Sequence, residues 1–121
     1  MMFYMLIVVV AAVAVSGVPQ KRDSIFCQSV EYSASDDSQA IQGLADTLDS
    51  QPSFSHSISF TYGSATAYGC DYGNGQTISG GQFTDYLDMV QSECGDDEAG
   101  YYDVPSSKAS FGITASGVGF C

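Results

Sequence analysis

The sequence predicts an α+β domain: a two-layer sandwich in which two helices pack on one face of an antiparallel sheet, closed by two disulfides. Three observations favour this class. Segments with the two-residue period of strands alternate with two segments of helical period. Their order along the chain is strand, helix, hairpin, helix, hairpin. Four cysteines occur in 121 residues, an even number typical of a small disulfide-linked protein.

An apolar run at the start of the chain predicts a secretory signal peptide over residues 1–17. Ala14 and Ser16, near the end of this run, have the spacing that signal peptidase recognises. The alternative is a membrane anchor. We disfavour it because the run is shorter than the ~20 apolar residues that a spanning helix needs.

A short pro-segment over residues 18–22 is expected next, because it ends in a dibasic pair. Lys21 and Arg22 form a site of the kind that furin- or kexin-type proteases cut. Cleavage there leaves residues 23–121 as one disulfide-linked domain. We therefore expect a secreted, extracellular protein with no stable membrane span after processing.

The predicted mature part is strongly acidic. It holds all fourteen Asp and Glu residues, and Lys108 is its one basic side chain, so its formal charge is 1 − 14 = −13. Nucleic acids and anionic membranes are bound through Lys and Arg near phosphate groups. This charge excludes both as expected partners and is compatible with a basic or neutral one.

The first strand and the first helix follow from apolar spacing. Phe26, Val30 and Tyr32 alternate with polar residues and predict a short strand with these three side chains on one face. Asp36 and Asp37 are acidic residues suited to the first turn of a helix. The helix then shows an apolar stripe before Pro52 stops it, formed by Ala40, Ile41, Leu44, Ala45 and Leu48.

Residues 57–62 and 65–70 alternate between small polar and larger apolar side chains, which predicts a β-hairpin. Ser79 and Gln82 then have the spacing of a capping box, so a second helix is expected through residues 83–94. Gly95 is well placed to end it.

The remaining segments are predicted to be an acidic loop and a second hairpin. Residues 95–100 contain three acidic residues and two glycines, a composition typical of a loop. Residues 110–115 alternate as a strand does. After a turn at Ser116 and Gly117, residues 118–121 are expected to return as the second strand of the hairpin.

Four cysteines allow three pairings. We expect Cys27–Cys121, because it would tie the terminal strands together. We expect Cys70–Cys94 as the second bridge, because it would join the end of the first hairpin to the end of the second helix.

The residues of the predicted domain do not form a recognisable catalytic set, so we expect a protein that is not an enzyme. His56 is the one histidine and arginine is absent, which excludes ribonuclease chemistry that needs a base, an acid and a cation. Asp85 and Asp88 are a candidate pair of catalytic carboxylates, but we expect them on the solvent side of the second helix rather than in a cleft. We expect no cofactor and no metal ion, because the acidic residues 93–98 lack calcium-loop spacing.

Aromatic residues beside the acidic loop are the candidate contact surface. Tyr101 and Tyr102 must point in opposite directions if the chain is extended there, so one of them is expected to be exposed. Exposed aromatics often anchor protein contacts. The candidate binding residues are therefore Tyr101, Tyr102, Asp96, Asp97 and Glu98.

Residues 65–73, the following helix and residues 109–113 resemble a family of secreted fungal effectors. These are the necrosis-inducing proteins related to the tomato leaf-mould "extracellular protein two", with an Ala-x-Tyr-Gly stretch, a helix and a late aromatic-Gly-Ile strand. Phe111-Gly112 stands where that family has Trp-Gly. The dibasic site and the layout also resemble smut-virus killer toxins, which are small secreted α/β sandwiches.

The resemblance implies a secreted effector or killer-toxin-like protein that binds a host or competitor target outside the cell. A protein component or another cell-surface component is the expected target. Two alternatives remain open. One is a structural or wall-associated protein of the producing cell, which a large exposed apolar patch would favour. The other is a small carboxylate-dependent hydrolase, which a cleft with two facing carboxylates would favour.

Overall fold

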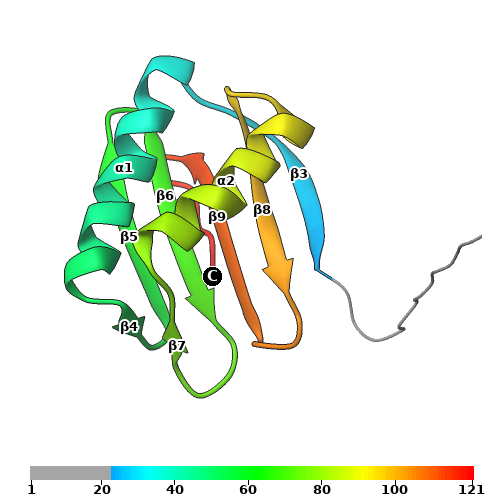
Figure 1. Ribbon diagram of the computed structural model, residues 1–121. Helices are drawn as coiled ribbons and strands as arrows, with labels where there is room; N and C mark the ends of the chain where they lie inside the picture. Colours follow the sequence, from blue (N-terminus) through cyan, green and yellow to red (C-terminus); the bar gives the residue numbers. More distant parts are fainter. Residues whose placement is uncertain (1–22) are drawn as a thin grey trace, which may run out of the picture.

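The computed structural model describes residues 23–121, so the predicted signal peptide, pro-segment and dibasic site lie outside the described residues. Two helices, α1 (Ala34–Ser50) and α2 (Gly80–Cys94), cover one face of a five-stranded antiparallel sheet (Figure 1). The predicted fold class is therefore confirmed. We call the side of the sheet that carries the helices the helix face and the other side the open face.

The sheet has the strand order β3-β8-β9-β6-β5, and each neighbouring pair is antiparallel. Its strands are β3 (Ser24–Glu31), β5 (Ser57–Tyr62), β6 (Ala65–Asp71), β8 (Glu98–Val104) and β9 (Ala109–Ala115). The predicted first hairpin is confirmed as β5 and β6. A separate two-stranded ladder joins β4 (Ser53–Phe54) to β7 (Gln76–Thr77).

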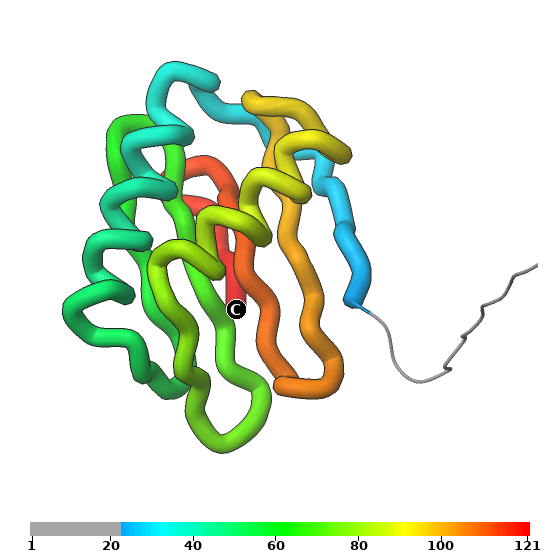
Figure 2. The backbone as a smooth tube through the Cα atoms, in the orientation of Figure 1, coloured from blue at the N-terminus to red at the C-terminus, as the bar shows by residue number. Residues whose placement is uncertain are grey.

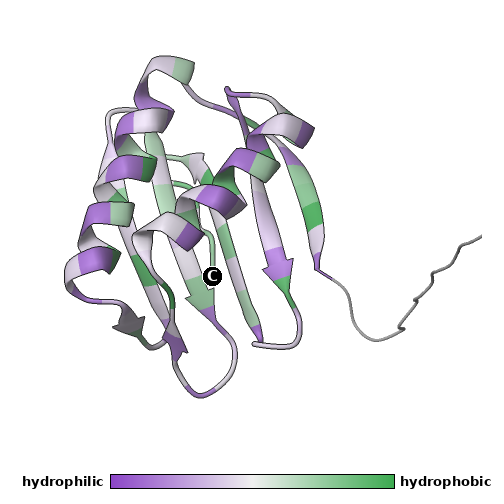
Figure 3. Cartoon of the chain, viewed as in Figure 1, coloured by the Kyte–Doolittle hydropathy of each residue, from purple (hydrophilic) through white to green (hydrophobic). Residues whose placement is uncertain are grey.

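The core lies between the helices and the sheet. Leu44 and Leu48 of α1, Phe83 and Leu87 of α2, and Ile113 of β9 are all completely buried there. Burying one such side chain contributes about 1.5–3 kcal/mol. Figure 3 shows hydrophilic and hydrophobic residues alternating along both helices, as expected when one helix face packs on a sheet and the other meets water.

Both helices begin close to their predicted starts. Ser79 caps α2: its hydroxyl accepts a hydrogen bond from the backbone N–H of Gln82 at 3.0 Å. The Gln82 side chain makes a different contact from that of a capping box: its amide nitrogen donates a hydrogen bond to the Tyr86 hydroxyl at 2.9 Å. Helix α1 begins at Ala34, just ahead of the predicted acidic first turn.

The prediction that Phe26, Val30 and Tyr32 share one face is wrong. The pairing of β3 with β8 shifts register between Cys27 and Glu31, and such a bulge reverses the direction of the side chains that follow. Tyr32 is buried in the core with Val30 packed against it, whereas Phe26 is 46% exposed and stacks on Tyr101.

The second hairpin is also different from the prediction. It is formed by β8 and β9, so the second half of the expected acidic loop, residues 98–100, belongs to a strand. Residues 116–121 are not a strand. They turn back and run along the sheet near β6 and β9 (Figure 2). We call residues 116–121 the C-terminal segment.

The predicted disulfides are both wrong: the bridges are Cys27–Cys94 and Cys70–Cys121. The reason is the direction of each side chain. Phe111 packs against Phe83 of α2 on the helix face, and its register partner is Gly69, so the next residue, Cys70, points to the open face. Cys94 is on α2 and cannot reach it through the sheet. Each face of the sheet therefore carries one bridge.

Candidate functional site

A pocket of about 390 Å³ opens on the open face of the sheet. Its residues come from four strands, the loop after β6 and the C-terminal segment. The lining consists of Gln28, Tyr68, Tyr72, Tyr101, Asp103, Ser110, Gly119, Phe120 and Cys121. Aromatic rings and polar groups thus meet in one place, as is usual for a ligand site.

Gly112 leaves room for the floor of this pocket. On β9 it lies between Tyr68 of β6 and Tyr101 of β8, its partners in register. A Cβ on Gly112 would lie 2.6 Å from the Tyr68 hydroxyl oxygen and 2.6 Å from the Tyr101 Cβ. The Tyr68 ring therefore extends over β9 toward Tyr101, and it does so because residue 112 has no side chain.

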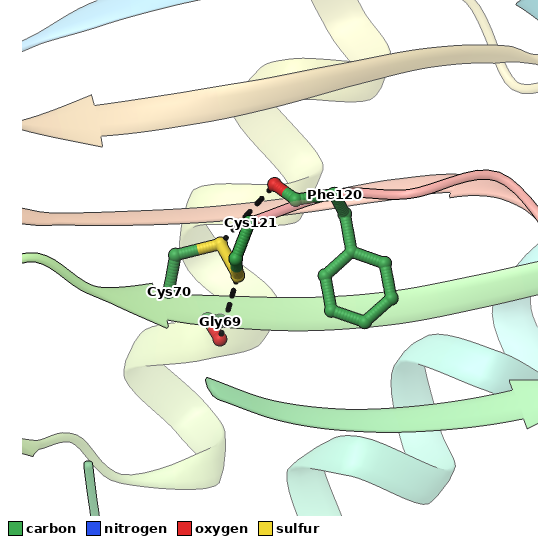
Figure 4. The surroundings of a disulfide bond; sticks show 4 residues. All are labelled: Gly69, Cys70, Phe120 and Cys121. Carbon is green, nitrogen blue, oxygen red and sulfur yellow. Dashed lines mark hydrogen bonds between the residues drawn. A yellow bond between two sulfur atoms is a disulfide. The ribbon is translucent and has the colours of Figure 1, made fainter. Parts of the chain in front are cut away.

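The C-terminal segment forms one wall. The Phe120 ring stacks on the Tyr68 ring with 4.7 Å between centroids. The next residue, Cys121, is bonded to Cys70 of β6 (Figure 4). Around this bridge the Phe120 carbonyl oxygen lies 3.3 Å from the Cys70 sulfur, and the Gly69 carbonyl oxygen lies 3.8 Å from the Cys121 sulfur. The bridge thus fixes the segment against the sheet.

Tyr101 forms another part of the lining and stacks on Phe26, with 5.2 Å between the ring centroids. Tyr72 stands at the rim and is 59% exposed. Asp103 follows Tyr101 at the next position of β8 on the same face and is half-buried. These residues leave the pocket open to solvent beside Tyr72.

Tyr68 presents an unused polar group to the pocket. The residue is 2% exposed, and no described residue makes a hydrogen bond to its hydroxyl. Burial raises the pKa of this hydroxyl far above its ordinary value, and the neighbouring Tyr101 adds to the effect. The hydroxyl therefore stays protonated and is available both to donate and to accept. Among the described residues, the fully buried side-chain oxygen without a hydrogen-bond partner is Thr114 Oγ1. The Tyr68 hydroxyl instead faces the open pocket, where water or a ligand can bind it.

The structure separates the candidate binding residues predicted from sequence. Tyr101 faces the pocket. Tyr102 points to the helix face, where it stacks on Tyr86 at 4.2 Å and donates a hydrogen bond to Asp23 at 3.0 Å. Burial, followed by the hydrogen bond to Asp23, raises the pKa of Tyr102 to about 12. The expected opposite orientation of these two tyrosines is confirmed, but the expectation that one of them is exposed is wrong, because both are half-buried.

The acidic part of the candidate set lies away from the pocket. Asp96 and Asp97 precede β8 and Glu98 begins it, whereas Asp103 of the pocket is near the other end of that strand. The backbone carbonyl of Asp97 accepts a hydrogen bond from the Tyr32 N–H at 3.1 Å. These three residues therefore belong to the junction between β3, α1 and β8 rather than to the pocket.

Sequence reasoning missed most of the pocket: Gln28, Tyr68, Asp103, Ser110 and Phe120 were not candidates. One signal was present. Tyr68 lies two residues before Cys70, and Phe120 directly precedes Cys121. The pairing Cys70–Cys121 would have placed these two rings together, but the expected pairing separated them.

A second group of polar residues lies at the end of the molecule near Asp96. Asp37 is 5% exposed, and its carboxylate accepts a hydrogen bond from the Gln91 side chain at 2.7 Å. Burial raises the pKa of Asp37, and the negative charge of Asp96 raises it further. The described residues contain no group of three or more His, Cys, Asp or Glu side chains that could hold a metal ion.

Comparisons with protein-family models, with curated proteins and with solved structures find no match. Over residues 23–121, no helix is long and apolar enough to cross a membrane.

Proposed function

We propose that the protein is a secreted effector or killer-toxin-like protein that acts outside the cell by binding a target in the open-face pocket. The observation that carries this proposal is the pocket itself. Its floor presents a tyrosine hydroxyl to which no described residue makes a hydrogen bond, and a disulfide fixes one of its walls. A preformed site of this kind suits binding, because little conformational freedom is lost when a ligand enters.

Two features support an extracellular site of action. All four cysteines are paired in disulfides, which persist in oxidising environments outside the cytosol. The N-terminal residues have the pattern of a signal peptide followed by a dibasic site. The resemblance to necrosis-inducing fungal effectors adds the expectation that the target belongs to a host or a competing organism.

The pocket does not favour the hydrolase alternative. Glycosidases place two carboxyl groups about 5–10 Å apart across the scissile bond. Among the residues that line this pocket, Asp103 alone carries a carboxylate side chain. The large exposed apolar side chains of the described residues are spread over both edge strands, the loop after β6, α2 and the C-terminal segment, which does not favour the wall-protein alternative. They are Phe26, Phe60, Tyr62, Tyr72, Met89 and Val118.

The test is a tissue assay with the purified, oxidised secreted protein. It is applied to plant leaf tissue and to competitor fungal cells, beside the reduced and alkylated protein. The Tyr101→Ala variant removes a pocket wall. Its matched control is Tyr62→Ala, which removes a 46% exposed tyrosine from the edge strand β5.

We expect the oxidised protein and Tyr62→Ala to cause cell death or growth arrest, and the reduced protein and Tyr101→Ala to cause much less. Circular dichroism of each variant shows whether it is folded. Full activity of a folded Tyr101→Ala variant would remove the pocket from the proposed function. A lack of response in every tissue would contradict the effector proposal and favour the wall-associated alternative.

A further inference from the structure

The open-face pocket also indicates the chemical class of its ligand. Asp103 is the one lining side chain that is charged at neutral pH. It is half-buried, so its carboxylate is less screened by solvent than a fully exposed one. A ligand group of positive charge would gain from this carboxylate, whereas an anionic group would be repelled.

The aromatic residues of the pocket favour the same charge. Tyr72 and Tyr101 line the pocket together with the stacked rings of Tyr68 and Phe120. The face of an aromatic ring carries partial negative charge and attracts ammonium and guanidinium groups within ~6 Å. Aromatic rings and one carboxylate therefore line the same pocket, a combination suited to an organic cation.

The charge of the whole domain also favours a cationic ligand. Residues 23–121 carry a formal charge of −13, and Lys108 is their one basic side chain. Lys108 does not line the pocket. A strongly negative surface raises the local concentration of cationic ligands and speeds their association at low ionic strength.

The remaining polar groups complete the recognition of a cation. The hydroxyl of Tyr68 and the side chains of Gln28 and Ser110 can each accept a hydrogen bond, and ammonium and guanidinium groups are donors only. A volume of about 390 Å³ is within the range of small-ligand pockets.

We propose that the open-face pocket binds an alkylammonium or guanidinium group, as carried by lysine and arginine side chains or by free amines. This inference rests on the proposed function, which places the binding site in the pocket. It adds the chemical class of the ligand. Asp103 pairs with the charge, the rings of Tyr72 and Tyr101 enclose the chain that carries it, and Tyr68 accepts a hydrogen bond at the floor.

The experiment is a titration of the ¹⁵N-labelled oxidised protein followed by NMR. The cationic probes are Nα-acetyl-lysine methylamide, Nα-acetyl-arginine methylamide and butylammonium. The neutral probes are the norleucine and citrulline analogues, which keep the shape of each side chain and lack its charge. N,N′-diacetylchitobiose tests a sugar ligand in the same pocket.

We expect saturable shifts at Tyr101, Asp103 and Ser110 with the cationic probes and none with their neutral analogues. Asp103→Asn should weaken binding about tenfold or more, since a charge-assisted contact is lost. The matched control is Asp88→Asn, which removes the same charge from an exposed position on α2, and it should change affinity less than twofold. Tighter binding of the amino-acid derivatives than of butylammonium identifies a protein side chain as the source, and the reverse identifies a free amine.

Equal shifts with cationic and neutral probes, or shifts with the sugar alone, would overturn the proposal. So would equal losses in Asp103→Asn and Asp88→Asn, because only the overall charge would then matter. The neutral probes test the wild-type protein and keep the result decisive if a variant fails to fold. A tissue response that needs Tyr101 without cation binding would leave the proposed function standing and refute the ligand class. Cation binding without a Tyr101-dependent tissue response would support the ligand class and refute the proposed function.

Discussion

Removing one disulfide at a time should separate the stability of the domain from the integrity of its pocket. The bridge Cys70–Cys121 spans 51 residues and Cys27–Cys94 spans 67. In the chain-entropy model a loop of either length contributes about 4 kcal/mol to the free energy of unfolding. This is a large part of the ~5–15 kcal/mol that stabilises a typical domain. The double variants Cys70→Ala/Cys121→Ala and Cys27→Ala/Cys94→Ala should therefore lose similar stability.

The two variants should differ on the open face. Without its bridge, the C-terminal segment is held mainly by the stacking of Phe120 on Tyr68 and by hydrogen bonds near its start, such as that from the Ser116 hydroxyl to the Gly63 carbonyl at 2.6 Å. These contacts are too few to keep it ordered, since fixing each residue costs about 1–2 kcal/mol of backbone entropy. The segment should detach and uncover Tyr68.

The assay combines urea unfolding with amide hydrogen exchange. Both double variants should show a lower unfolding midpoint. Only Cys70→Ala/Cys121→Ala should show fast exchange at residues 119–121 and a changed NMR environment for Tyr68 at low temperature, where the sheet is still folded. Protection of the segment in that variant, or its loss in Cys27→Ala/Cys94→Ala, would refute the reasoning that the bridge holds the pocket wall.

Three further variants test other parts of the structure. Folding raises the pKa of Asp37, so its carboxyl group favours the folded state at low pH and this contribution is lost as the pH rises through the raised pKa. Asp37→Asn should accordingly be more stable than the wild type in urea unfolding at pH 7 and lose that advantage at pH 3. No advantage at pH 7 would contradict the raised pKa. Ser79→Ala removes the cap of α2 and should cost about 1 kcal/mol. Ser33→Ala is the control at the start of α1, where the side chain makes no cap hydrogen bond, and it should cost much less. Equal costs would show that the Ser79 cap contributes little. Gly112→Ala places a methyl group against Tyr68 and should cost about 1–3 kcal/mol by overpacking. Gly119→Ala meets no atom within 4 Å and should be nearly neutral by the same measurement, so a tolerated Gly112→Ala would mean that the floor can adapt.

The fold class could be predicted because the apolar periods of its main elements are strong. The stripe of α1, the cap of α2 at Ser79 and the alternation of β5 and β6 each belong to one segment, so local sequence was sufficient. These elements face a single core, and their patterns agree with it.

Strand β8 was not predicted because its residues are determined by contacts with residues that are distant in sequence. Gly100 weakens the strand pattern, yet a Cβ at this position would lie 2.8 Å from the Cys94 sulfur and 2.9 Å from the Phe26 carbonyl oxygen. A glycine that makes room for a disulfide has the same local appearance as a loop glycine.

The pocket could not be predicted for a related reason. Its floor needs Gly112 between Tyr68 and Tyr101, and this arrangement depends on the order of three strands. Its wall needs the C-terminal segment, which was expected to be a strand. Tyr101 alone was identified, because two consecutive tyrosines in an extended segment must point in opposite directions, which is a local signal.

The structure of the open face depends above all on the bond between Cys70 and Cys121. The most direct test is a peptide map of the secreted protein, digested without reduction by a protease that cuts at Asp, since Asp residues separate the four cysteines. The structure predicts peptides that join Cys27 to Cys94 and Cys70 to Cys121. Peptides that join Cys121 to Cys27 would detach the C-terminal segment from β6 and contradict both the pocket and the function proposed for it.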